Sequence, residues 1–561
     1  MAPELSEVPG DVLAEVLRRL EPHGLASARR VCRAWHDTVD ARLRGHLLSR
    51  SVRGIFINFS WWCTYSEFFS RPSTGPAICG GLDFLPCMMG VKVTDHCNGI
   101  LLCRDESPDA QPREYVVNPA TRRWTRLPQR PRPRMAESGQ TAYLAFDPAV
   151  SPHFEVFLIP RVPSAGESDD DDVDDNDNPL LESEWPPASY VMHVFSSVTQ
   201  RWDETTFIRV GEAAGAGIVA NMHTDVEDDR YRYRAVYWQS ALYVHCQHGY
   251  LTRMSLLDHT YSVIKLPSAE HPNHHLGKSK EGVYCAISCS WDGFLQLWHL
   301  NESCGRIEWV LKHDTHLEIF EHEDKKLGRR WVLQDVNHRK WFFDHIGNKH
   351  GDYRAPVEGK YDWNSDEDNI VDTALQKNIE DIEGNVEEGY RDPYYFLGFH
   401  PYKEIVFLIL AGIRARGMAY DWNNSKFQDL GDVSPADFDP CCGLPCGETD
   451  AAFPYTPCWM GEFPGNELES LIEDQELYRK KLEMEEESNF TCMDEYEFAQ
   501  VPWARQEDQG PYCQDSSQTS YNRSVEHHLH RHQGQGDFYK GDQVYCLGPR
   551  RFPLALPSLP T

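Results

Sequence analysis

Four cysteines near the end of the sequence could in principle bind a metal ion. They are Cys441, Cys442, Cys446 and Cys458. A structural zinc site usually takes two pairs of ligands, with two or four residues between the members of each pair. Here only one plausible pair exists, so we interpret these cysteines as ordinary buried or loop thiols and expect no metal.

Other residues that could support chemistry lack the partners that a reaction needs. We find no glycine-rich phosphate loop, no G-x-S-x-G elbow and no H-E-x-x-H motif. Trp291-Asp292-Gly293 is similar to the end of a WD repeat, but without a Gly-His partner it indicates a turn between strands. Four histidines belong to a polar tail: His527, His528, His530 and His532. The sequence therefore predicts a protein that is not an enzyme and needs no cofactor.

The formal net charge of -32 limits the partners that the protein can bind. Such an acidic protein repels phosphate backbones, which disfavours nucleic-acid binding. The sequence contains no run of about 18 apolar residues, so it predicts no membrane-spanning helix. The charged N-terminus is unlike a secretory signal. We expect the 17 cysteines to be reduced thiols in a cytoplasmic or nuclear protein.

Residues 8–48 predict three short helices. The apolar residues of the first recur at i, i+3, i+4 and i+7, which places them on one helix face: Leu13, Val16, Leu17 and Leu20. Pro9 suits the first turn, and Pro22 is expected to end this helix. The pattern predicts a second helix over 25–32 and a third over 35–43.

From about residue 52, short apolar runs alternate with Pro, Gly, Asn and Asp. The clearest runs are 54–59, 115–117, 154–159, 191–195, 235–245, 283–288, 294–300 and 405–410. Many strands at short spacing predict an all-β sandwich, barrel or propeller.

Two recurring patterns favour the propeller. The first is an aromatic turn followed by an apolar run: 144–148 with 154–159, and 397–401 with 405–410. Phe146 and Phe399 are 253 residues apart, close to five periods of about 50, the length of a kelch-type repeat. The second is a polar turn, a β-branched or aromatic residue and then Leu: 118–128, 259–267 and 423–430.

Composition divides the chain into three regions. A small all-α region over 1–50 precedes a mainly-β region over 51–435. Acidic insertions near 163–187 and 352–392 interrupt the second region and are expected to be solvated. The third region, 436–561, is an irregular acidic extension. It carries one charged helix at about 466–489 and a polar tail that is expected to be disordered.

The N-terminal segment resembles the F-box. The resemblance rests on Val8-Pro9-Gly10-Asp11-Val12-Leu13, on the following Glu15 and Leu17, and on Val31-Cys32-Arg33-Ala34-Trp35. Val8 stands where the family usually has Leu. The body is similar to the kelch-like, propeller-like interaction region of plant F-box proteins, through the segments 97–102 and 117–124.

The resemblance implies a substrate-recognition subunit of a Skp-cullin-F-box ubiquitin ligase, which recruits an unknown protein target without doing chemistry. The helices would bind a Skp-type adaptor, and through it a cullin-RING ligase. The expected adaptor contacts are Val8, Pro9, Val12, Leu13, Val16, Leu17, Leu20 and Leu25. The expected core of the small domain is Ala28, Val31, Cys32, Trp35 and Val39.

Two alternatives remain open. The protein could bind the adaptor as a scaffold without a role in degradation. The β region could instead be a glycan-binding, lectin-like propeller, for which Trp238, Trp291 and Trp298 would supply aromatic platforms. The same tryptophans more often pack propeller blades together.

Overall fold

The computed structural model describes residues 9–59, 66–71, 78–87, 91–105, 112–133, 139–161, 184–212, 234–246, 249–268, 273–289, 293–303, 306–317, 331–334, 394–411, 415–433 and 449–461. The chain divides into two compact units, 1–493 and 494–561, and every described residue belongs to the first. Several predicted features lie outside these ranges: Val8, Trp291, Asp292, Cys441, Cys442, Cys446, residues 163–183, the insertion 352–392, the helix 466–489 and the tail.

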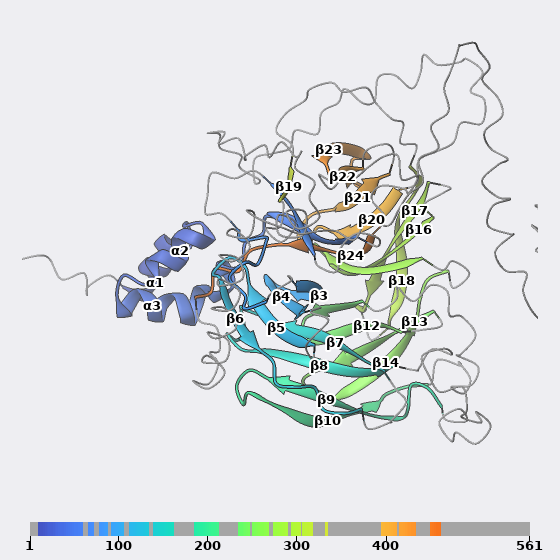
Figure 1. Ribbon diagram of the computed structural model, residues 1–561, viewed down its shortest axis with the longest axis horizontal. Coiled ribbons are helices and arrows are strands. Elements are labelled where there is room, and N and C mark those ends of the chain that lie inside the picture. Colours follow the sequence, from blue (N-terminus) through green and yellow to red (C-terminus); the bar gives the residue numbers. More distant parts are fainter. Residues whose placement is uncertain are drawn as a thin grey trace, which may run out of the picture. The chain divides into compact units, whose positions relative to one another are not determined.

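Three short helices form the N-terminal region, as predicted (Figure 1). They are α1 (Gly10–Leu17), α2 (Pro22–Ala28) and α3 (Arg33–Thr38), and α3 continues through the turns η2 (Val39–Leu43) and η3 (Arg44–Leu47). Pro22 is the first residue of α2, where its missing N–H and fixed φ cost nothing. The second helix therefore begins before the predicted Leu25.

The rest of the described chain is mostly β and forms sets of four antiparallel strands. The first set is β3 (Val91–Cys97), β4 (Ile100–Asp105), β5 (Arg113–Asn118) and β6 (Arg123–Arg126). The second is β7 (Gly139–Phe146), β8 (Phe154–Arg161), β9 (Ser189–Ser196) and β10 (Arg201–Arg209). The third is β11 (Ala235–Trp238), β12 (Ala241–Cys246), β13 (Tyr250–Ser255) and β14 (Thr260–Lys265).

The fourth set is β15 (His274–Ser279), β16 (Gly282–Cys289), β17 (Phe294–Asn301) and β18 (Glu308–His316). The fifth is β20 (Tyr394–Phe399), β21 (Ile405–Leu410), β22 (Arg416–Asp421) and β23 (Lys426–Asp432). The sixth joins β24 (Thr449–Tyr455) to β1 (Gly54–Phe59), β2 (Glu67–Ser70) and β19 (Val332–Gln334). A parallel pair between β10 and β14 merges the second and third sets into one eight-stranded sheet.

The leading strands of these sets contact one another in series. β3 contacts β7, β7 contacts β11, β11 contacts β15, β15 contacts β20, and β20 contacts β24. The series closes because β1, the neighbour of β24, contacts β3. This order is that of a β-propeller-like body, which confirms the predicted mainly-β, propeller-like fold class.

Both recurring sequence patterns correspond to hairpins at equivalent places. The first pattern is the hairpin between the first two strands of a set, in β7–β8 and in β20–β21. The second is the hairpin between the last two strands, in β5–β6, β13–β14 and β22–β23. The predicted spacing of five repeats is wrong, because β7 and β20 begin sets that are three apart. The 253 residues between Phe146 and Phe399 exceed three repeats of about 50 because long segments separate some of the strands.

The body closes by pairing strands from its two ends. β24 is antiparallel to β1, with Gly54 opposite Tyr455 and Ile57 opposite Ala452. The β region therefore extends past residue 435, its expected end. Such closure buries the edges of the first and last strands and removes sites for unwanted strand pairing.

Asn98 and Gly99 form the two-residue turn between β3 and β4, where Cys97 pairs with Ile100. Their φ angles are 46° and 88°, the left-handed conformation that a type I′ hairpin turn requires. A Cβ on Gly99 would lie 2.6 Å from both Cβ and N of Cys458. The segment that follows β24 thus passes directly over this turn.

Asn118 belongs to the second segment that resembles plant F-box proteins. It binds the same segment after β24, which we call the returning chain. Its Nδ2 donates to the carbonyl of Cys458 at 2.9 Å. Its Oδ1 accepts from the backbone N–H of Ala120 at 3.1 Å, which shapes the turn into β6. Both segments therefore act structurally, by fixing the chain after β24.

Candidate partner-binding surface

The N-terminal helices bury part of their apolar surface against the β body. The helical residues of the shared cluster are Leu13, Leu17, Leu25, Ala28, Val39, Leu43 and Leu47. Their cluster includes residues of the first two strand sets and of the returning chain: Cys97, Ile100, Leu102, Leu144, Phe146, Phe154, Cys458 and Met460. A region this small cannot bury a sufficient core alone, and the body completes it.

The opposite side of α1 exposes a second set of apolar side chains. Val12 is 52% exposed, Val16 is 55% exposed and Leu20, just past the helix, is also exposed. Val12 and Val16 lie one turn apart and thus share one side of the helix. We call Val12, Val16 and Leu20 the α1 apolar face. Adjacent exposed apolar side chains typically mark a surface that binds a partner.

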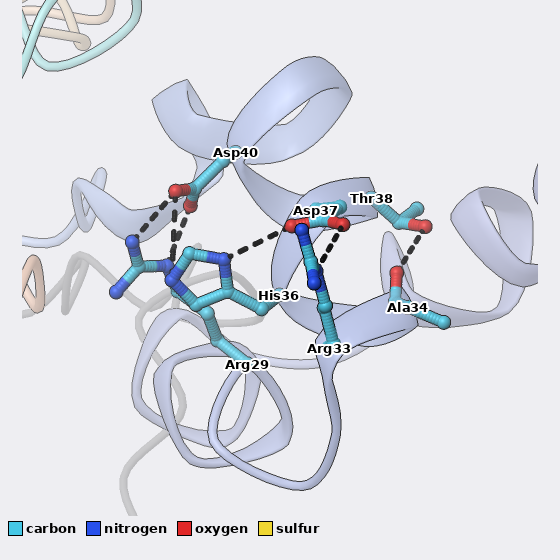
Figure 2. Close-up of polar contacts among 7 residues, drawn as sticks. All are labelled: Arg29, Arg33, Ala34, His36, Asp37, Thr38 and Asp40. Carbon is cyan, nitrogen blue, oxygen red and sulfur yellow. Dashed lines mark hydrogen bonds and ion pairs between the residues drawn. The ribbon is translucent and has the colours of Figure 1, made fainter.

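A partly buried ion pair joins the end of α2 to η2 (Figure 2). The Nε and Nη2 of Arg29 donate to the two carboxylate oxygens of Asp40 at 2.5 Å and 2.7 Å. Nε2 of His36 lies 3.8 Å from Oδ2 of the same carboxylate. Burial acts to raise the pKa of Asp40, but the hydrogen bonds and charge of Arg29 outweigh it and lower the pKa.

The chain after β24 attaches the helices to the body. Ser49 donates its backbone N–H to the carbonyl of Pro457, and Trp459 donates to the carbonyl of Leu47, both at 2.8 Å. The ring of Trp459 also meets His23 of α2 edge to face, with 4.7 Å between centroids. Helices and body therefore share backbone hydrogen bonds as well as an apolar cluster.

The family comparison decides what this helical region is. A family model described as F-box-like matches residues 5–47. The chain carries an F-box-like domain at its N-terminus. F-box domains generally bind Skp-type adaptors, and F-box proteins are generally non-catalytic adaptors. None of the curated protein sequences compared with the chain is similar to it.

Solved structures resemble the chain only distantly. The dihydro-heme d1 dehydrogenase NirN in complex with DHE is 8% identical over 72% of this chain and 75% of its own, with a TM-score of 0.29. A protein from Lactobacillus plantarum is 10% identical over 73% and 98%, with a TM-score of 0.28. The β-propeller domain of Cps50 (Swd1) from Myceliophteria thermophila is 12% identical over 39% and 59%, with a TM-score of 0.20. Scores this low carry no argument about function.

The structure divides the predicted adaptor contacts of the F-box-like domain into two groups. Pro9, Val12, Val16 and Leu20 are exposed, whereas Leu13, Leu17 and Leu25 are buried in the shared cluster, where α1 contacts α3 and η2 and α2 contacts η3, and cannot be reached in this conformation. Both sides of α1 are apolar, so the helical period alone could not tell which side is buried in the cluster.

The predicted core of the F-box-like domain needs a correction. Ala28 and Val39 are buried, and Trp35 is half-buried against the same cluster, in agreement with the prediction. Val31 is instead 64% exposed and Cys32 is exposed, so their predicted place in the core is wrong. The cause is that α2 ends at Ala28, before the helical pattern could turn them inward.

Sequence reasoning did not find the pair of Arg29 and Asp40, since eleven residues separate them. We expect Arg29→Ala to lower the free energy of unfolding by about 1.5–3 kcal/mol, the usual worth of a hydrogen-bonded charge. Arg33→Ala is the control, because Arg33 and Asp37 form an exposed pair at 3.8 Å. It should cost less than about 0.5 kcal/mol.

The effect of Arg29→Ala should depend on pH. The pKa of Asp40 in the folded protein is below its ordinary value of 3.8, so the stability it contributes is present above that value. It is lost as the pH falls through the folded pKa, when the carboxylate takes up a proton. Urea unfolding at pH 7 and pH 3 should therefore give a smaller difference at pH 3. An equal difference at both pH values would rule out this ion pair as the cause.

The other predicted sites have a structural role where they are described. Trp238 and Trp298 pack against one apolar cluster between the third and fourth strand sets, and Cys285 and Cys458 are buried. Within the described ranges, no group of three or more metal-binding side chains comes together. In the same ranges, no helix has the length and hydropathy of a membrane span.

Proposed function

We propose that the protein is the substrate-recognition adaptor of a Skp-cullin-F-box ubiquitin ligase of the plant type, acting in the cytoplasm, the nucleus or both. The observation that carries this proposal is the α1 apolar face, exposed on a domain whose sequence is F-box-like. The Skp-type adaptor covers this face, and the kelch-like body binds a protein target. The chain does no chemistry and acts by holding target lysines near a charged conjugating enzyme.

The division of α1 into two sides suggests how to test adaptor binding without unfolding the protein. Substituting Leu13 or Leu17 by Asp would place a charge in the shared cluster and disturb the fold. The double variant Val12→Asp/Val16→Asp instead changes two exposed side chains. We expect it to weaken binding of a purified Skp-type adaptor at least tenfold, because apolar contacts are lost and charges must be desolvated.

Binding is measured by calorimetry with the full chain. The control is Val198→Asp/Leu257→Asp, which adds the same two charges at exposed positions of the β body. It should bind the adaptor like the wild type. Adaptor binding that is absent from the wild type, or unchanged in the α1 variant, would contradict the proposal. Proximity labelling with and without proteasome inhibition then separates a degradative adaptor from a scaffold.

A further inference from the structure

The inner strands of the β body enclose a cavity of about 130 Å³. β3, β11, β15, β20 and β24 line it, so every part of the closed series except the second strand set contributes. Its charged and titratable side chains are Asp95, His96, Cys97, Arg234, Tyr237, Lys278 and Asp450. Two of these, Arg234 and Lys278, are basic, although the chain as a whole carries a net charge of -32.

Lys278, on β15, has only a neutral partner in this cavity. Its Nζ donates to Oδ1 of Asn98 at 2.6 Å. Among the residues that the structure describes, no carboxylate forms an ion pair with Lys278. Burial lowers the pKa of its ammonium group. The charge of Asp147 partly opposes this effect without forming an ion pair. A buried ammonium group that no carboxylate contacts is costly, and an anion in the cavity would relieve that cost.

The amide of Asn98 cannot turn away from this lysine freely. Asn98 belongs to the turn between β3 and β4, and its Nδ2 donates to the carbonyl of Phe146 at 2.5 Å. Oδ1 is therefore directed at Lys278, which fixes the position of the ammonium group. A cation held in place in this way is prepared to bind a ligand without further ordering.

The two acids of the cavity already have other partners. Oδ2 of Asp95 accepts the backbone N–H of Leu144 at 2.7 Å, and Asp450 lies 3.6 Å from Nζ of Lys92. Burial raises the pKa of Asp95 to about 7, which reduces its negative charge near neutral pH. Burial, followed by the charges of Lys278 and Arg234, lowers the pKa of His96 to about 3. A neighbouring imidazole thus experiences the positive potential of both cations.

We propose that this cavity binds a single carboxylate group, with the ammonium of Lys278 as its counterion and the guanidinium of Arg234 beside it. One negative charge matches the one ammonium group, which no carboxylate contacts among the described residues. Phosphate carries a larger charge than this one ammonium group can balance, so we expect it to bind more weakly. The volume exceeds the roughly 10–15 Å³ that one water needs, so a carboxylate fits. This site belongs to the β body and does not depend on the proposed role in a ligase.

The test is thermal unfolding of the full chain with sodium acetate as the probe. Sodium chloride at equal ionic strength and neutral acetamide are the controls. Acetate at ten times its dissociation constant should raise the midpoint by about 2 °C, because it binds the folded state. Chloride and acetamide should not, and phosphate should act more weakly than acetate. Equal shifts with chloride or acetamide would overturn the proposal.

Variants of Lys278 locate the effect. Lys278→Met and Lys278→Gln should both lose the response to acetate, and Gln keeps a donor for Asn98 if Met disturbs folding. Without acetate, Lys278→Met should be at least as stable as the wild type, since an uncompensated charge is gone. Lys265→Met, at an exposed lysine outside the cavity, should respond like the wild type. An acetate response that persists in both Lys278 variants would place the site elsewhere and refute the assignment.

Two blocked peptides distinguish the sources of the carboxylate. N-acetyl-Ala-Glu-Ala-amide presents one on a side chain, and N-acetyl-Ala-Gln-Ala-amide is its neutral counterpart. If the Glu peptide raises the unfolding midpoint at a lower concentration than acetate does, the ligand of the cavity is an acidic side chain of a polypeptide. A shift by acetate alone assigns it to a small free carboxylate.

Discussion

Leu17→Ala should lower the free energy of unfolding by about 2–5 kcal/mol, the usual cost of such a truncation in a packed core. Leu17 is 1% exposed and belongs to the cluster that the F-box-like domain shares with the β body. The neighbouring Val16→Ala should cost less than about 0.5 kcal/mol, because Val16 is 55% exposed. Adjacent residues of one helix thus differ because only one side of the helix is buried in the cluster.

Denaturant unfolding followed by near-ultraviolet circular dichroism measures both variants. The adaptor-binding assay should rank them in the opposite order when both are folded. Val16→Ala removes part of the α1 apolar face, whereas Leu17→Ala leaves that face in place. Equal stability losses in the two variants would show that α1 does not bury Leu17 in this cluster.

Gly99→Ala should lower the free energy of unfolding by about 2–5 kcal/mol, from two causes. A left-handed φ costs a residue with a Cβ about 1–2 kcal/mol, and forced overpacking adds about 1–3 kcal/mol. The new Cβ would stand 2.6 Å from Cys458, whose backbone cannot move without breaking its bond to Asn118. The isolated antiparallel β-bridge between the backbones of Leu48 and Cys458 would also be disturbed.

Gly211→Ala separates the two causes. Gly211 has a φ of 91°, close to the 88° of Gly99, but a Cβ there would have no atom within 4 Å. It should therefore show only the conformational cost of about 1–2 kcal/mol. Thermal and urea unfolding of the two variants measure the difference. If both variants lose the same stability, the returning chain does not constrain Gly99.

Local patterns were enough to predict many elements of this fold. The apolar runs 54–59 and 405–410 match β1 and β21 residue for residue, because each is a buried strand bounded by turn residues. The run 235–245 contained two strands, since a left-handed turn at Gln239 and Ser240 divides it. Hairpins were predictable because their partners are close in sequence.

Contacts between distant segments could not be predicted from such patterns. The pairing of β1 with β24 joins residues almost four hundred positions apart, and nothing local to 449–455 names β1 as its partner. Likewise the cavity gathers residues from five strands, so Lys278 carried no signal in the sequence beyond being a lysine in a strand. Asn98, the partner of Lys278, stood out in the sequence only as part of the segment 97–102 that resembles plant F-box proteins.

The closing strand has a consequence for how the chain is made. A ribosome adds roughly 5–20 residues per second, so β1 waits about 20–80 s for β24 to be synthesised. The F-box-like domain waits as well, because Cys458 and Met460 complete the cluster in which Leu13 and Leu17 are buried. A nascent or truncated chain would lack this part of the cluster, and the edge of β1 that pairs with β24 would stay open. Completion of the body therefore closes this edge of β1 and completes the apolar cluster beneath the helices in one step.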